Sequence, residues 1–154
     1  KTALANSQNE AQDFKERWMQ AMADVQNIRR RAEQEKADAH KYGISKLLED
    51  LIPVADSLEQ SLNINEEGNE LAKSMRDGMA LTLQLLQKTL HKFGVLEINP
   101  EAGSFFDPHL HEVMLSQPHS EFAANTIISV LQKGYQLHGR LIRPARVMIA
   151  KADA

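Results

Sequence analysis

The sequence contains no cysteine, which excludes disulfides, thiol nucleophiles and thiolate metal ligands. It is also poor in aromatic residues, which make up 5% of the chain against 42% for all hydrophobic residues. A globular core built from 154 residues usually holds more large aromatic side chains, so much of the apolar content is expected in narrow helical stripes. The net charge of −3 argues against general nucleic-acid binding, which requires a strongly basic surface.

The chain also lacks long apolar runs and phosphate-binding loops. No run approaches the roughly 20 consecutive apolar residues that cross a bilayer, so we expect no membrane association. The seven glycines are scattered and form neither of the glycine-rich motifs that hold phosphates. The sequence therefore predicts no direct nucleotide binding and no cofactor. The absence of cysteine fits a reducing compartment such as the cytoplasm.

The chain divides into two unlike parts near Phe93. Residues 3–92 are rich in Ala, Leu, Gln, Glu and Lys, which favour helices. Four of the five prolines and most clusters of β-branched residues follow Phe93. We therefore predict an α+β protein with a long helix in residues 1–47, two bundle helices in residues 48–93 and a small all-β domain in residues 94–154.

Apolar residues in the first part recur at alternating steps of three and four, which is the spacing of a coiled-coil seam. A lone helix would expose this stripe to water, so a second copy of the chain is the expected partner. Ala32 and Glu35 occupy seam positions where large aliphatic residues pack best, so the seam is weak and is expected to open at modest temperature. The predicted seam residues are Phe14, Trp18, Val25 and Ile28.

Two amphipathic helices are expected between residues 48 and 93, joined by a polar loop at residues 63–69. Pro53 predicts a kink or a restart of the first, with Asp50 as its candidate N-cap. Two such hairpins from two chains would form a four-helix bundle. Packing within one chain is the alternative, but it leaves the N-terminal seam unpaired. The residues predicted for the bundle interface are Leu51, Leu58, Met79, Leu83 and Leu86.

The last part of the chain predicts short strands. The β-rich runs cover residues 95–98, 126–131, 135–137, 141–142 and 146–149. His138 and Gly139 lie between two of these runs and predict a tight turn. Pro144 predicts an edge position or a bulge, because proline cannot donate a ladder hydrogen bond.

His109, His111 and Glu112 form an arrangement that can hold a metal ion. No third ligand follows at a defined spacing, and no nucleophile, base and orienting group are linked by spacing, so we predict neither a metal site nor catalytic residues. Asp107 and Pro108 instead predict a turn in which the Asp107 carboxylate accepts hydrogen bonds from backbone donors.

Two arginine clusters are candidate contacts for a partner protein. Three consecutive arginines at 29–31 lie on the predicted long helix, where they form either a solvated face or a contact for an acidic patch. Arg140, Arg143 and Arg146 lie near the predicted last turn, and strand alternation would place Arg140 and Arg146 on one face if no bulge intervenes. The planar fork of arginine binds carboxylates bidentately, which favours it at protein interfaces, although a solvated surface is again the alternative.

Several motifs in order resemble the GrpE family over residues 14–151. They are VQNIRRR at 25–31, AHKY at 39–42, LEDLIPVADSL at 48–58, KFGV at 92–95, FDPHLHE at 106–112, GY at 134–135, GR at 139–140 and IRPARV at 142–147. The resemblance implies a parallel dimer with paired long helices, a dimeric four-helix bundle and a β-wing on each chain. It also implies a cytoplasmic location in a bacterium, with the mitochondrial matrix as the alternative.

The resemblance further implies a nucleotide exchange factor rather than an enzyme. Such a factor binds the ATPase domain of a DnaK-type chaperone, holds its nucleotide cleft open and accelerates ADP release. By position, Arg29 and Arg30 of the long helix and Arg140 and Ile149 of the wing are expected to face the chaperone. Arg143 and Arg146 are added as expected contacts because they belong to the same arginine cluster as Arg140. The family is also associated with thermal unwinding of its long helices, which a weak seam would suit.

Two alternatives belong to other functional classes. A structural adaptor that only dimerises through a coiled coil would not need the motifs of the C-terminal domain. A metal-dependent or hydrolytic enzyme would depend on the 109–112 segment.

Overall fold

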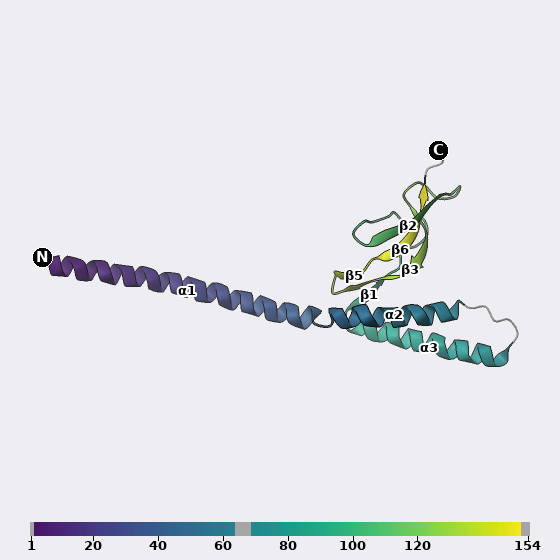
Figure 1. The fold of residues 1–154 in the computed structure, drawn as a ribbon, viewed down its shortest axis with the longest axis horizontal. Coiled ribbons are helices and arrows are strands. Elements are labelled where there is room, and N and C mark those ends of the chain that lie inside the picture. Colours follow the sequence, from purple (N-terminus) through teal and green to yellow (C-terminus); the bar gives the residue numbers. More distant parts are fainter. Residues whose placement is uncertain (1, 64–68, 152–154) are drawn as a thin grey trace. The chain divides into compact units, whose positions relative to one another are not determined.

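The computed structural model describes residues 2–63 and 69–151, so residues 64–68 of the expected polar loop lie outside the described part of the chain. In these described residues, three helices precede six strands, which confirms the predicted α+β class (Figure 1). The helices are α1 Thr2–Tyr42, α2 Ser45–Leu62 and α3 Glu70–Lys92. The strands are β1 Val95–Ile98, β2 His111–Pro118, β3 Ile127–Gln132, β4 Gly134–Leu137, β5 Arg140–Arg143 and β6 Ala145–Lys151.

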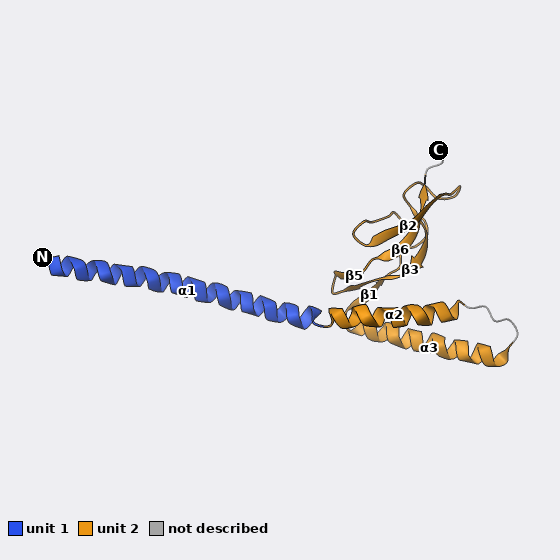
Figure 2. Cartoon of the chain, viewed as in Figure 1, with its two compact units in different colours: residues 1–43 blue, residues 44–154 orange. Residues whose placement is uncertain are grey.

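Helix α1 belongs to a compact unit of its own, residues 1–43, separate from residues 44–154 (Figure 2). None of its 41 residues is buried, so α1 has no core within this chain. The four predicted seam residues, Phe14, Trp18, Val25 and Ile28, are each between 58% and 70% exposed. Helix propensity and surface pairs one turn apart, such as Gln12 with Glu16 at 2.9 Å, are what favour the helix in a single chain.

The long helical run breaks before residue 47. Helix α1 ends at Tyr42 and α2 begins at Ser45. At the break, Gly43 lies so close to the turn before it that an added Cβ would be 2.6 Å from the carbonyl oxygen of Ala39. The expected restart at Pro53 does not occur, because α2 continues through this residue and Asp50 lies inside the helix rather than at its N-cap.

Helices α2 and α3 lie side by side as a hairpin (Figure 1). The side chain of Asn69 caps α3 by accepting a hydrogen bond from the backbone N–H of Leu71 at 3.0 Å. The buried residues fall on one face of each helix, as the 3.6-residue period requires. They are Leu48, Ile52 and Ala55 in α2 and Leu83 and Leu90 in α3.

Gly94 joins the helical hairpin to the strands. Its φ of 84° is left-handed, and its N–H donates to the carbonyl of His91 at 3.0 Å, which ends α3. An added Cβ would collide with the ring of His138. The carbonyl of Gly94 accepts the N–H of His138 at 2.9 Å, so β1 starts directly in register with β4.

The six strands form two three-stranded sheets, which we call the wing. The first is antiparallel with the order β1-β4-β5. The second has the order β2-β6-β3, in which β2 is parallel and β3 antiparallel to β6. The wing has a core cluster of Ile98 from the first sheet and Ile127, Ala145 and Val147 from the second. The five predicted strands are confirmed to within two residues at each end.

Strand β2 and the change of sheet were not predicted. Seven of the eight residues of β2 are exposed, so the strand carries no alternating apolar pattern. Pro144 lies between β5 and β6, where the chain passes from the first sheet to the second. Gly134 makes room for this crossing, because an added Cβ there would collide with the backbone of Ala145.

No helix in the described part of the chain is long and apolar enough to cross a membrane.

Substitution of Leu137 tests the core of the first sheet. Leu137 is 0% exposed, so Leu137→Ala should lower the free energy of unfolding by about 2–5 kcal/mol through lost burial and a cavity. Leu141 lies on β5, across the turn at His138 and Gly139, and is 40% exposed. Leu141→Ala should therefore lower the free energy of unfolding by less than about 1 kcal/mol. Urea unfolding followed by circular dichroism measures both. Equal losses of unfolding free energy in the two variants would contradict the burial of Leu137.

Candidate functional site

The arginines of α1 lie on an exposed helix. Arg29 forms a surface ion pair with Glu33, with Nε 3.4 Å from Oε1. Both side chains are largely exposed, so the pair adds little to the stability of the helix. Arg30 and Arg31 are exposed as well. The triplet therefore presents positive charge to solvent without being required for the fold.

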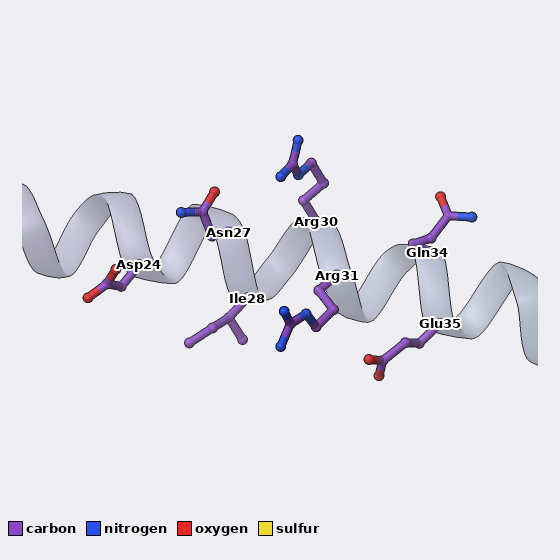
Figure 3. Close-up of a pocket in the computed structure, with 7 residues that line it drawn as sticks. All are labelled: Asp24, Asn27, Ile28, Arg30, Arg31, Gln34 and Glu35. Atoms are coloured by element: carbon purple, nitrogen blue, oxygen red, sulfur yellow. The ribbon is translucent and has the colours of Figure 1, made fainter.

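In Figure 3, the side chains near Arg30 and Arg31 point to two opposite sides of α1. Ile28, Arg31 and Glu35 point to one side, and Asn27 and Arg30 point to the other. Because Ile28 and Glu35 belong to the seam spacing, Arg31 flanks the seam while Arg30 points away from it. A second helix packed on the seam would leave Arg30 accessible.

Arg140 and Arg146 lie in different sheets, so the uninterrupted strand alternation that would place them on one face is absent. Arg140 begins β5 in the first sheet, whereas Arg146 lies on β6 in the second. The cause is Pro144, at which the chain changes sheet. Arg140 is exposed and follows the turn at His138 and Gly139, whose φ angles of 47° and 83° identify a type I′ hairpin turn. The predicted turn is confirmed.

Arg146 lies between the two neighbours of its own strand. Its Nε is 3.0 Å from Oε2 of Glu112 on β2, and its Nη1 donates to Oε1 of Gln132 on β3 at 3.3 Å. Ile149, farther along β6, is half-buried against the core cluster of the wing. Both residues are therefore positioned by the wing, and the side chain of Arg146 remains 46% exposed, against 21% for Arg143.

Arg143 differs from the other arginines because it contacts helix α2. Its side chain is 21% exposed, and it binds Asp56 with two parallel contacts, Nη1 to Oδ2 at 2.5 Å and Nη2 to Oδ1 at 2.8 Å. Nη2 also donates to the carbonyl of Lys133 at 2.6 Å. The hydrogen bond with Asp56 raises the pKa of Arg143 above its usual value, so the guanidinium stays charged.

Further polar contacts surround this pair and form what we call the docking cluster. Nζ of Lys133 lies 2.5 Å from Oε1 of Glu59 and 3.2 Å from Oε2 of Glu97. Burial opposes the charge of Lys133, but the hydrogen bond to Glu59 and the charge of Glu97 raise its pKa overall. Gln132 donates to Oδ2 of Asp56 at 2.8 Å. The cluster consists of Asp56, Glu59, Glu97, Gln132, Lys133 and Arg143.

Tyr135 lies beneath the docking cluster. The guanidinium carbon of Arg143 is 5.6 Å from the centre of its ring, which is the distance of a cation–π contact. Tyr135 is 1% exposed, and within the described residues neither its hydroxyl nor Nε of Arg143 has a hydrogen-bond partner. Burial raises the pKa of Tyr135, so its hydroxyl remains neutral.

Comparison with known proteins identifies the family. A sequence profile of the GrpE family matches residues 1–151. Protein GrpE of Coxiella burnetii (strain Dugway 5J108-111) is 48% identical over 147 residues, which cover 96% of this chain and 72% of the relative. Protein GrpE of Legionella pneumophila (strain Corby) is 44% identical over the same shares of both chains, and that of Aeromonas hydrophila is 41% identical over 98% of this chain and 78% of the relative.

The chain belongs to the GrpE family. Its role is therefore that of a co-chaperone of a DnaK-type chaperone, and it is not an enzyme.

The predicted interface residues of this GrpE chain differ in what they contact. The four seam residues of α1 are exposed, and Leu51, Leu58, Met79 and Leu86 of the hairpin are half-buried. Leu83 is buried within the chain. The hairpin also has a second, exposed apolar stripe on each helix. Its residues are Leu47 and Val54 on α2 and Leu71, Met75, Leu81 and Leu85 on α3.

The FDPHLHE motif of GrpE has a structural role here. Oδ1 of Asp107 accepts the backbone N–H of His109 at 2.8 Å, which confirms the predicted turn. Nδ1 of the buried His111 accepts the backbone N–H of Asp107 at 3.0 Å, so this nitrogen is not available as a metal ligand. Within residues 2–63 and 69–151, no three His, Asp or Glu side chains come together as metal ligands.

His111 should make the stability of the wing depend on pH. Burial lowers its pKa below 6.5, so at mildly acidic pH the unfolded chain binds a proton that the folded chain does not. The free energy of unfolding should therefore fall as pH drops below about 6.5, by at most about 1.4 kcal/mol per pH unit.

His111→Asn keeps an acceptor near Nδ1 but does not titrate. Urea unfolding at several pH values should show that this part of the pH dependence is lost in His111→Asn and kept in His109→Asn, because His109 is exposed. An unchanged pH dependence in His111→Asn would rule out the neutral, buried imidazole.

Proposed function

We propose that this co-chaperone is a nucleotide exchange factor of the bacterial cytoplasm. It binds the ATPase domain of a DnaK-type chaperone, holds the nucleotide cleft open and accelerates ADP release. A protein that binds the open state more tightly than the closed state shifts the population toward release by the difference between its two affinities. The observation that best supports this proposal is Arg140, an exposed arginine that directly follows a type I′ turn on an edge strand of the first sheet.

The chaperone-facing residues are Arg29 and Arg30 on α1 and Arg140, Arg146 and Ile149 on the wing. Arg30 points away from the seam, so dimerisation leaves it accessible (Figure 3). A rigid strand presents Arg140 with little loss of backbone entropy on binding, which favours affinity. Arg143 belongs to the same sequence cluster, but its fork is already occupied by Asp56, so we assign it a role within the chain.

We also propose a homodimer with a parallel coiled coil of two α1 helices and a four-helix bundle of two hairpins. Helix α1 buries no residue, although Phe14, Trp18, Val25 and Ile28 recur at heptad spacing. The exposed stripe of the hairpin lies beside its buried face, so a second hairpin would complete a bundle core. Each feature leaves apolar surface in water that a second copy of the chain would cover.

The exchange activity is measured by the release of a fluorescent ADP analogue from a DnaK-type chaperone in stopped flow. The protein should accelerate release strongly, and Arg140→Ala should reduce the acceleration about tenfold or more at subsaturating concentration, which corresponds to about 1.4 kcal/mol of binding energy. Glu121→Gln changes an exposed charge elsewhere on the wing and should have no effect.

No acceleration by the unmodified protein would contradict the exchange function and favour the coiled-coil adaptor. Acceleration that Arg140→Ala leaves unchanged would support exchange but remove the wing arginine from the contact.

The weak seam leads us to propose that α1 unwinds at a lower temperature than residues 44–154, as a thermosensor requires. Ile28→Asp places a charge in the seam and should lower the α1 transition by several degrees and weaken the dimer. Asn27→Asp adds the same charge on the opposite side of the helix and should change neither (Figure 3). Circular dichroism melting and sedimentation measure these effects. A single transition for the whole chain, or equal effects of the two variants, would contradict the proposal.

A further inference from the structure

Helix α2 and the wing are held together at two points in the docking cluster. Asp56 binds Arg143 of β5, and Glu59 binds Lys133, which lies between β3 and β4. Asp56 and Glu59 are three residues apart, so they project from neighbouring positions on α2. Two contacts spaced along a helix constrain both the place and the rotation of the wing, whereas a single contact constrains only its place.

The contact of Arg143 with Asp56 fixes direction as well as distance. A guanidinium that binds both oxygens of one carboxylate must lie in nearly the same plane as that carboxylate. Arg143 uses Nη1 and Nη2 in this way, and Nη2 also binds the carbonyl of Lys133. Gln132 occupies a further position on Oδ2 of Asp56. The carboxylate of Asp56 is thus held by two neighbouring parts of the wing at once.

The cluster is poorly suited to adding stability. Nε of Arg143 and the hydroxyl of Tyr135 are buried without partners among the described residues, and unsatisfied polar groups of this kind are costly. The ion pairs are only 21–29% exposed, and pairs shielded from water in this way lose much of their attraction to desolvation. An arrangement that costs stability but fixes an angle is better explained by the need for a defined geometry.

The geometry that the cluster fixes includes the position of Arg140. Arg143 and Arg140 are the last and first residues of the same four-residue strand, so their backbones are about 10 Å apart. Strand β5 is paired with β4, with Arg143 opposite Tyr135 and Arg140 opposite Leu137. The register shifts between Tyr135 and Gln136, so Ile142 is an extra residue at which β5 bends, but the pairs on either side of it hold both ends of the strand against β4. The contact at Arg143 therefore sets the direction from which Arg140 leaves the turn.

We propose that Asp56 and Arg143 are positioning residues for nucleotide exchange, which set the angle at which the wing presents Arg140 to the chaperone. Glu59 and Lys133 form the second point of the same attachment. This inference rests on the proposed exchange function, and it assigns a role to residues that would not touch the chaperone themselves.

A double-mutant cycle with the chaperone's ATPase domain tests this role. The variants Asp56→Asn, Arg140→Ala and the double variant are compared in affinity for the domain and in ADP release. Asp56→Asn should weaken affinity about tenfold, which corresponds to about 1.4 kcal/mol. Once Arg140 is absent its position no longer matters, so Asp56→Asn should then weaken affinity by less than about threefold.

Three further variants separate positioning from folding. Arg143→Lys keeps the charge but loses the planar fork, so it should weaken affinity while the wing still unfolds at nearly the same urea concentration. The charge-swapped variant Asp56→Arg/Arg143→Asp should recover part of the lost affinity. Asp50→Asn removes a carboxylate from an exposed position on the same helix and should leave affinity within about twofold.

The outcomes distinguish the two proposals. The positioning role would be overturned, with exchange left intact, by either of two results. One is unchanged affinity in both Asp56→Asn and Arg143→Lys. The other is a double variant whose fold-loss of affinity equals the product of the losses in Asp56→Asn and Arg140→Ala, because the two effects would then be independent. Failure of the unmodified protein to bind the domain or to accelerate release would instead overturn the proposed function. If Asp56→Asn unfolds the wing, Arg143→Lys decides between positioning and no positioning.

Discussion

The attachment of the wing to the helical hairpin depends on the carboxylate of Asp56. It binds both terminal nitrogens of Arg143 and the side chain of Gln132, and the neighbouring Glu59 binds Lys133. These contacts join α2 to segments 74–87 residues away in the chain. Gly94 gives the wing a covalent pivot at the end of α3, and the docking cluster determines where the wing lies about that pivot. The surface that carries Arg140 follows from this attachment.

The helices are subject to a different constraint, which is apolar surface that one chain does not bury. Helix α1 has a seam without a core, and the α2–α3 hairpin has an exposed stripe beside its buried face. The same surface supports our proposal of a homodimer and of early unwinding, because small and charged residues such as Ala32 and Glu35 interrupt the seam. Stability in the helical part would then come from the partner chain, whereas the wing has its own core around Val147.

Local patterns were sufficient for most of the fold. Heptad spacing and helix-forming composition predicted α1 and the hairpin, and β-rich runs with the His138-Gly139 turn predicted five of the six strands. Strand β2 was not predicted because seven of its eight residues are exposed and show no alternating apolar pattern. Helix α2 continues through Pro53 instead of restarting there, because burial of the nearby Ile52 and Ala55 stabilises the helix. The docking cluster could not be predicted, because local sequence patterns carry no information on contacts between distant segments. For the same reason, Arg140, Arg143 and Arg146 were grouped from the sequence although they lie in three different environments.

The most direct test of the account is amide hydrogen exchange of this chain with and without the ADP-free ATPase domain of a DnaK-type chaperone. We expect slowed exchange in the wing at residues 138–141 and along α1 around Arg30, because these segments carry the proposed contacts. Protection confined to the hairpin, with none at the turn before Arg140, would contradict the wing as the working surface.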